Sequence, residues 1–161
     1  MATIANIVQT KIVEVYQLPS WEPRLPLRQL WVAYQFWDWV ENTIELHDDS
    51  FKSGGRTLFE HMEQIFCDFR CSKRIGAGDI RRMVPNVDGI RKMHPVGLRI
   101  YGWAPEKDSF VAVTGALESV TKRDKMTNDN KMKCVLDFIK SNNLKHTVTQ
   151  GDNSVVYPPH D

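Results

Sequence analysis

Residues 86–125 read NVDGIRKMHPVGLRIYGWAPEKDSFVAVTGALESVTKRDK, and their alternation and turn residues predict the central part of the fold. In its middle segment, apolar side chains point to one side and cationic or aromatic side chains to the other: Leu98 and Ile100 against Arg99, Tyr101 and Trp103. The turn-forming sequences PVG and PEKD lie on either side of this segment. The stretch therefore predicts an antiparallel sheet of three strands, at residues 90–94, 97–103 and 110–117.

The predicted sheet has one cationic face. In its first strand Lys92 and His94 alternate with Arg91 and Met93. A sheet with one apolar face on a core and one face of Arg, Lys, His and Tyr is suited to binding a phosphodiester. An ordinary amphipathic sheet with a solvated polar face gives the same pattern, since half-exposed antiparallel sheets are common. The pattern alone leaves both interpretations open.

The composition is that of a soluble globular protein. A chain of 161 residues, 42% hydrophobic and 25% charged, fits one domain with a sizeable core. It has no run of about eighteen apolar residues and no secretory pattern at its start, so no membrane span and no secretion are expected. Three cysteines suit a reducing cytoplasm, and Cys67 and Cys71 lack the second ligand pair of a zinc site. We expect a cytoplasmic protein without metal or other cofactor.

Charge is segregated along the chain although the net charge is only +1. Residues 1–69 hold five Lys or Arg and ten Asp or Glu, which gives −5. Residues 70–101 hold eight basic residues and two acidic ones, which gives +6. The remainder balances at eight against eight. A local basic block indicates an anionic partner. Alternatively, the acidic and basic segments are simply neighbours in the fold.

The N-terminal half predicts one strand and one helix. Residues 11–18 are β-branched and alternate in polarity, which predicts a strand. Residues 27–46 predict a helix, because their apolar side chains recur at helical spacing: Leu27, Leu30, Trp31, Tyr34, Trp37, Val40 and Ile44. An aromatic cluster of this kind is more often core than binding site.

Two further helices are predicted on either side of the sheet segment. Thr57 and Glu60 have the spacing of a capping box and begin a helix that extends to residue 71. A last helix is expected over residues 128–142, capped by Thr127, with an apolar face toward the core made of Met132, Val135, Leu136 and Ile139. The element order is therefore strand, helix, helix, three-stranded meander, helix.

With the stretches DGIRKMHP, GLRIYGWAPEKDSFVAVTGALES and TKRDKMTNDNKMKCVLDFIKSN, this order resembles the RelE/ParE superfamily of bacterial toxins. The nearest branch is the HigB-like and phage-derived toxin-like proteins. Three features carry the resemblance: Arg99 in the middle strand, the apolar final strand FVAVTGAL and the lysine-containing link TKRDK before the last helix. The resemblance covers residues 56–142.

The resemblance implies an α+β fold, in which helices pack on one face of a small antiparallel sheet of three to four strands. We accordingly expect a single domain over residues 1–161. Within it, residues 56–142 form the RelE-like core, and residues 1–55 form an extension with a strand and an aromatic-rich helix. Residues 143–161 form a flexible tail, because they are polar and contain a Pro-Pro pair.

The resemblance also implies a function. Active members of the RelE branch cleave mRNA without metal, often in the ribosomal A site, by attack of the 2′-hydroxyl on the adjacent phosphate. Here Arg99 would contact the scissile phosphate, His94 or Lys92 would assist proton transfer, and Tyr101 would stack on a base or donate a hydrogen bond. The expected partners are mRNA or the ribosome and a cognate antitoxin. Further RNA-binding residues are expected at Arg91, Arg81, Arg82, Lys122 and Arg123.

The chain also departs from these toxins. It is nearly neutral, whereas they are usually strongly basic, and its acidic N-terminal half is extra. Pro95 restricts the backbone of His94. Two other classes therefore stay open: a non-catalytic toxin-fold module that binds a protein such as a topoisomerase or an antitoxin, and an accessory protein of phage or plasmid origin that keeps the fold as a scaffold. An RNase requires its cationic cluster on one exposed face.

Overall fold

The computed structural model describes residues 4–47, 53–73, 80–82 and 90–144, and its centre is a six-stranded sheet in the order β1-β2-β6-β5-β4-β3. The pair β2 and β6 is parallel, and the other neighbours are antiparallel. The α+β class is thus confirmed, but the predicted sheet of three to four strands was too small. The strands are β1 Val13–Val15, β2 Gln29–Ala33, β3 Ile80–Arg82, β4 Ile90–Met93, β5 Leu98–Trp103 and β6 Ser109–Leu117.

The three strands predicted from residues 86–125 form as expected. β4 pairs with β5 and β5 pairs with β6, each in antiparallel register. β6 is buried from Ser109 to Ala116 without alternation. Such a continuous buried run is typical of a strand that is covered on both faces.

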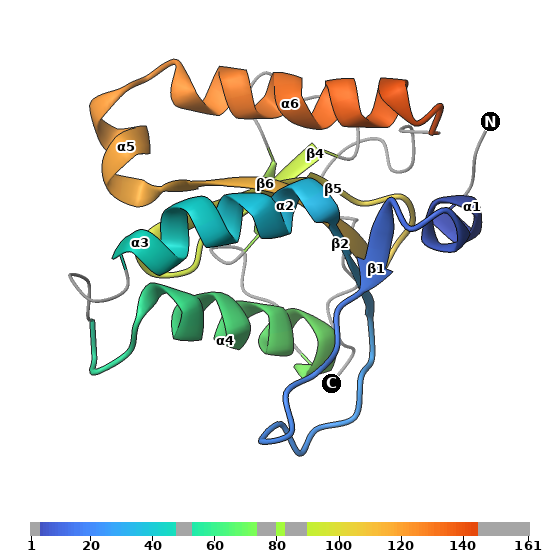
Figure 1. Ribbon diagram of the computed structural model, residues 1–161. Coiled ribbons are helices and arrows are strands. Elements are labelled where there is room, and N and C mark those ends of the chain that lie inside the picture. Colours follow the sequence, from blue (N-terminus) through green and yellow to red (C-terminus); the bar gives the residue numbers. More distant parts are fainter. Residues whose placement is uncertain (1–3, 48–52, 74–79, 83–89, 145–161) are drawn as a thin grey trace.

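Helices cover both faces of this sheet. Figure 1 shows α6 on one side of the sheet and α4 on the other. The expectation that all helices lie on one face was therefore wrong. The helices are α1 Ile4–Gln9, α2 Tyr34–Trp39, the π-helix η1 Val40–Ile44, α3 Glu45–His47, α4 Leu58–Cys71, α5 Glu118–Arg123 and α6 Thr127–Ser141. Within the described ranges, none of them is long and apolar enough for a bilayer crossing.

Two hydrophobic cores share the sheet. The first core lies between the sheet and α2, η1 and α4, and it includes Phe36, Val40, Ile44, Met62, Phe66, Ile100 and Phe110. The second core lies between the sheet and α1 and α6, and it includes Ile7, Trp31, Tyr101, Trp103, Val135 and Ile139. The alternation along β5 therefore separates two buried faces, not a buried face from a solvated one.

The helix predicted over residues 27–46 begins only at Tyr34. The preceding residues form β2, in which Leu30 and Val32 belong to the first core and Trp31 and Ala33 to the second. A strand buried on both faces reads as a continuous apolar run, which periodicity cannot distinguish from a buried helix. This explains why a helix was predicted where the chain forms β2.

The helix ends were predicted with mixed success. The capping box of α4 is confirmed, because Thr57 Oγ1 accepts from the Glu60 amide at 3.2 Å and Glu60 Oε2 accepts from the Thr57 amide at 2.8 Å. Thr127, however, is the first residue of α6 and not its cap, which is Met126. The short helix α5 was not predicted. Most of the predicted tail, residues 145–161, lies outside the described residues, as do residues 1–3 and 48–52 of the expected extension.

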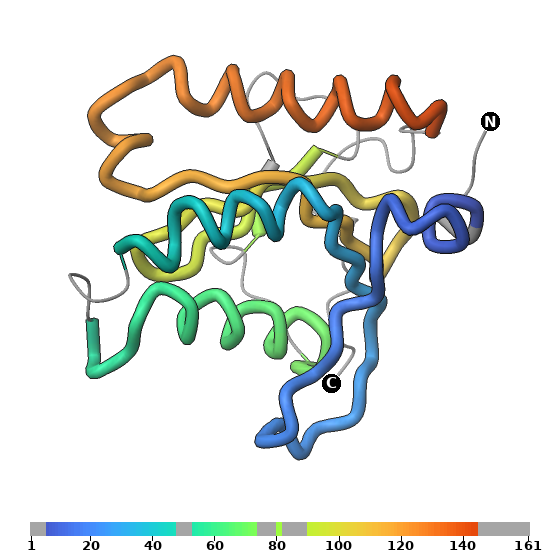
Figure 2. The backbone as a smooth tube through the Cα atoms, viewed as in Figure 1, coloured from blue at the N-terminus to red at the C-terminus, as the bar shows by residue number. Residues whose placement is uncertain are grey.

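The loop between β1 and β2 is attached to the C-terminal end of α4. Figure 2 shows residues 16–28 projecting below the sheet beside this end of the helix. Arg24 Nη2 donates to Asp68 Oδ1 at 2.9 Å, and Arg70 Nη1 donates to the Tyr16 carbonyl at 2.7 Å. Arg70 of the basic block thus holds the acidic N-terminal half in place, so the two segments are in part neighbours in the fold.

Candidate functional site

The four residues predicted to be catalytic lie together on one face of β4 and β5. Lys92 is opposite Tyr101 in the register, and Arg99 lies two residues before Tyr101 on the same face. His94 follows β4, and its ring lies in the positive field of Arg99 and Lys92. The structure therefore brings together residues that are up to nine positions apart in the chain.

This face is partly covered, not exposed as an RNase was expected to require. Tyr101 is 0% exposed, and the Arg99 side chain is 15% exposed. Lys92 and His94 are half-buried. The cover is α6, whose Phe138 ring lies 5.9 Å from the ring of Trp103. Trp103 and Tyr101 are large apolar surfaces on this face, and burying them under a helix is favourable.

α6 also contributes polar side chains to the cluster. Asn128 Oδ1 accepts from the Tyr101 hydroxyl at 2.7 Å and from Lys92 Nζ at 3.3 Å. Lys131 Nζ donates to Thr114 Oγ1 of β6 at 3.5 Å. We did not predict Asn128 or Lys131 as site residues. The available signal was their spacing of three residues, which places two polar side chains on one face of a helix.

Arg99 is held in a network around Glu118, the first residue of α5. Arg99 Nη2 lies 3.2 Å from Glu118 Oε1, and Lys122 Nζ lies 2.5 Å from the same oxygen. The amide of Gly97 donates to Glu118 Oε2 at 3.3 Å. Arg99 Nη1 donates to the Leu98 carbonyl at 2.6 Å. Glu118 was missed because α5 was not predicted.

The electrostatics of the cluster follow from burial and from crowding of cations. Burial, with Arg99 and Arg81 nearby, lowers the pKa of Lys92. Burial, together with Arg99 and Lys92, lowers the pKa of His94 from 6.5 to about 3. Burial raises the pKa of Tyr101 to about 12. At neutral pH, His94 is therefore uncharged and Tyr101 keeps its proton, while the Lys92 amine loses its proton more readily than an exposed lysine.

In the glutamate of this network, Glu118, the charged form is favoured, whereas in Lys92 and His94 the charged form is disfavoured. The hydrogen bond from Lys122 lowers the pKa of Glu118, and Arg99 and the Gly97 amide act in the same direction. Glu118 is therefore a carboxylate at neutral pH. It brings a negative charge to a site that is otherwise formed by cations.

Arg91 does not lie where the sequence predicted. It is 2% exposed, and its Nη1 donates to the Ile90 carbonyl at 2.9 Å. Strand alternation places it on the face opposite Lys92. A role in surface RNA contact is therefore not available to Arg91 in this structure.

Of the other predicted RNA-binding residues, Arg81 and Lys122 lie next to the cluster. Arg81 is exposed on β3 and is opposite Lys92 in the register. Lys122, with a side chain 72% exposed, and Arg123 lie on α5. Arg82 lies in β3 opposite Arg91, and its side chain falls outside the described part of the structure.

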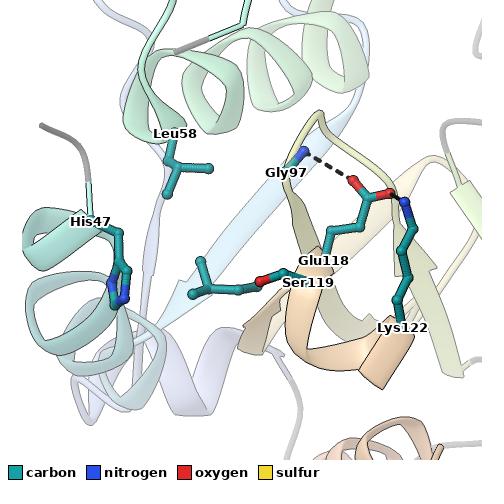
Figure 3. Close-up of a pocket in the computed structure, with 7 residues that line it drawn as sticks. His47, Leu58, Gly97, Glu118, Ser119 and Lys122 are labelled. Atoms are coloured by element: carbon teal, nitrogen blue, oxygen red, sulfur yellow. Dashed lines mark hydrogen bonds and ion pairs between the residues drawn. The ribbon is translucent and has the colours of Figure 1, made fainter. Parts of the chain in front are cut away.

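A pocket of about 350 Å³ lies beside the glutamate network. Figure 3 shows Glu118 pointing toward Gly97 and Lys122 at its wall, with His47 of α3 and Leu58 of α4 across the opening. The pocket is lined by His47, Leu58, Gly97, Leu117, Glu118, Ser119 and Lys122. It therefore adjoins the carboxylate that holds Arg99.

No group of three or more His, Cys, Asp or Glu side chains placed to hold a metal ion occurs among the residues described. Cys67 and Cys71 lie in α4, and burial raises the pKa of both thiols, that of Cys67 to about 12.

Comparison of the chain with protein-family models, with curated proteins and with solved structures finds no match.

Proposed function

We propose that the protein is a metal-independent endoribonuclease, the toxin of a phage-related type II toxin–antitoxin system that cleaves mRNA at the ribosome in the cytoplasm. One observation carries this proposal. An amine with a lowered pKa, Lys92, and a guanidinium, Arg99, lie on the same face of adjacent strands in a half-buried cationic site. The rest of the proposal comes from the resemblance to the RelE branch.

The chemistry divides between these two side chains. Lys92 takes the proton from the 2′-hydroxyl, which then attacks the adjacent phosphorus. Arg99 stabilises the charge that develops on the phosphoryl oxygens. The bond to the 5′-oxygen breaks, which leaves a 2′,3′-cyclic phosphate, and the proton returns from Lys92 to the leaving oxygen. The lowered pKa of Lys92 brings it closer to the working pH than an exposed lysine, which favours both transfers.

His94 and Tyr101 take different roles from those first expected. A histidine with a pKa of about 3 is a poor proton donor at neutral pH. Its Nε2 atom is buried and has no hydrogen-bond partner among the described residues, so the neutral ring is an inner part of the site and does not meet the RNA. Tyr101 is fully buried and cannot stack on a base, and through Asn128 it positions Lys92.

A second candidate is the non-catalytic binding module, which would act on a protein such as a topoisomerase or an antitoxin. The burial of Tyr101 under α6 favours it, because this cover leaves less open surface for a nucleotide base. A protein binder has no need of an exposed cationic cluster. The two candidates differ in whether Lys92 and Arg99 are required for activity.

The test is cleavage of mRNA by purified protein with ribosomes supplied, alongside growth on induced expression. Lys92→Met and Arg99→Ala should each reduce the cleavage rate by about 100-fold or more. Lys133→Met is the matched control, because it removes an exposed lysine from α6 and should cleave normally. Absence of cleavage by the wild type, or full cleavage by Arg99→Ala, would transfer the assignment to the binding module.

A further inference from the structure

We propose that Glu118 is an internal counterion that occupies the phosphate position of Arg99, and that an RNA phosphate must displace it to bind. This inference rests on the phosphate site of the proposed function and adds the competition that controls it. The carboxylate, not the open strand face, then sets how tightly the site binds an anion.

The donors around Glu118 are those that bind a phosphate group. A guanidinium from Arg99, an ammonium from Lys122 and a backbone amide from Gly97 converge on its two oxygens at 3.2, 2.5 and 3.3 Å. The three donors come from β5, α5 and the turn before β5. Charged side chains and backbone N–H groups of this kind are the usual ligands of phosphate oxygens.

Charge balance also supports an exchange of anions. Glu118 is the group that opposes the cations acting on His94, which are Arg99, Lys92 and Arg81. A phosphodiester carries one negative charge, as does this carboxylate. Replacement of one by the other keeps the net charge of the site, whereas removal of the carboxylate alone leaves clustered cations uncompensated.

The structure has room for the displaced carboxylate. The side chain of Glu118 is 24% exposed, and Lys122 on its outer side is 72% exposed. The pocket of about 350 Å³ in Figure 3 borders Glu118 and Ser119. A rotation of the glutamate side chain into this space would free the Arg99 guanidinium while α5 stays in place.

The experiment measures binding of a 2′-O-methyl oligonucleotide, which lacks the attacking hydroxyl and therefore cannot be cleaved. Glu118→Gln should bind about three- to tenfold more tightly than the wild type. The slope of log K against log salt should steepen by about 0.7, because one further cation becomes available to a single-stranded phosphate. Glu106→Gln makes the same change in charge on the β5–β6 turn and should leave both quantities unchanged.

A double-mutant cycle supplies the second measurement. In an Arg99→Ala background, Glu118→Gln should tighten binding and steepen the salt slope less than it does in the wild type, because the Lys122 ammonium is then the one remaining cation of the pair that it frees. Thermal unfolding checks that each variant is folded, and Glu118→Ala replaces the glutamine variant if that one is not. The same steepening is expected of it.

Each outcome is decisive. Equal affinity and equal slope for Glu118→Gln and the wild type would overturn the inference, as would an unchanged effect of Glu118→Gln without Arg99. Absence of oligonucleotide binding by all variants would overturn the inference and the phosphate site together. If Glu118→Gln shows the tighter binding and the steeper slope but the wild type cleaves no mRNA in the ribosome assay, the inference stands and only the nuclease activity is excluded.

Discussion

His94 shows how single residues behave at the half-buried sheet face. Its imidazole is removed from water and faces Arg99 and Lys92, so the protonated form is disfavoured. The alternation of residues 90–94 correctly predicted that His94 lies on the same face as Lys92. Alternation predicts which face of the sheet a side chain is on, but not how deeply it is buried. Its low pKa could therefore not be predicted from the sequence.

The low pKa makes the protein less stable in acid. As the pH falls below 6.5, the unfolded chain binds a proton at His94 that the folded protein refuses until about pH 3. The free energy of unfolding therefore decreases across this window. Between pH 7 and pH 4, the free energy of unfolding of His94→Asn should decrease by roughly 1–2 kcal/mol less than that of the wild type. Urea denaturation at the two pH values measures this difference. Parallel losses in the two proteins would show that His94 is not the group responsible.

Asn128 should control the protonation of Lys92. Asn128→Asp places a carboxylate within reach of Lys92 Nζ, which favours the ammonium form. The rate of Lys92 acetylation at pH 8, followed by mass spectrometry, should decrease by about threefold or more. Asn130→Asp, an exposed position two residues along α6, is the control and should leave the rate unchanged. A similar decrease in both variants would mean that general charge, not this contact, governs Lys92.

At the scale of elements, the predictions for β5 and β2 differ because the chemistry of their faces differs. β5 was predicted because its two faces differ in chemistry, and turn sequences mark its ends. β2 was predicted as helix because both of its faces are apolar. In the π-helix η1 the apolar spacing still reads as helical, and Val40 and Ile44 stay in the core with Phe36.

Two glycines allow close approach between elements of the sheet and its cover. At Gly102 the pairing of β5 with β6 is irregular, and a Cβ atom there would collide with the carbonyl oxygen of Val111. At Gly115 a Cβ atom would meet the indole ring of Trp39, which lies over β6. The neighbour of Gly102 is a backbone atom that the sheet holds in place. The neighbour of Gly115 is a side chain, which can move to make room for a methyl group.

This difference is testable. Gly115→Ala should lower the free energy of unfolding by about 1–3 kcal/mol, and adding Trp39→Leu should recover part of that loss. Gly102→Ala should lower the free energy of unfolding by at least as much as Gly115→Ala. Adding Trp39→Leu to Gly102→Ala should recover none of that loss. Chemical denaturation of the two pairs of variants gives these values. Equal recovery at both sites would contradict the contact with Trp39.

For the whole molecule, the sequence could not reveal that the second face is covered. The same alternation results whether Arg99, Tyr101 and Trp103 face water or a helix. The composition of this face held one hint, because a solvated face seldom carries both Trp and Tyr. In the fold, Tyr101 and Trp103 are fully buried. The site is consequently a half-closed cluster with hydrogen-bond acceptors from α5 and α6, Glu118 and Asn128, and not the open strand face that the resemblance implied.

The two cores share one sheet, so we expect them to unfold together as one domain. Phe36→Ala in the first core should lower the free energy of unfolding by about 3–5 kcal/mol, and Ile139→Ala in the second by about 2–5 kcal/mol. Trp37→Ala should cost less than Phe36→Ala, because Trp37 is half-buried and its indole donates to Glu14 at the surface. Each variant should show a single transition, coincident by tryptophan fluorescence and circular dichroism. Two separate transitions in Ile139→Ala would mean that α6 unfolds from the sheet on its own, and the cluster around Lys92 and Arg99 would then be exposed in the intermediate.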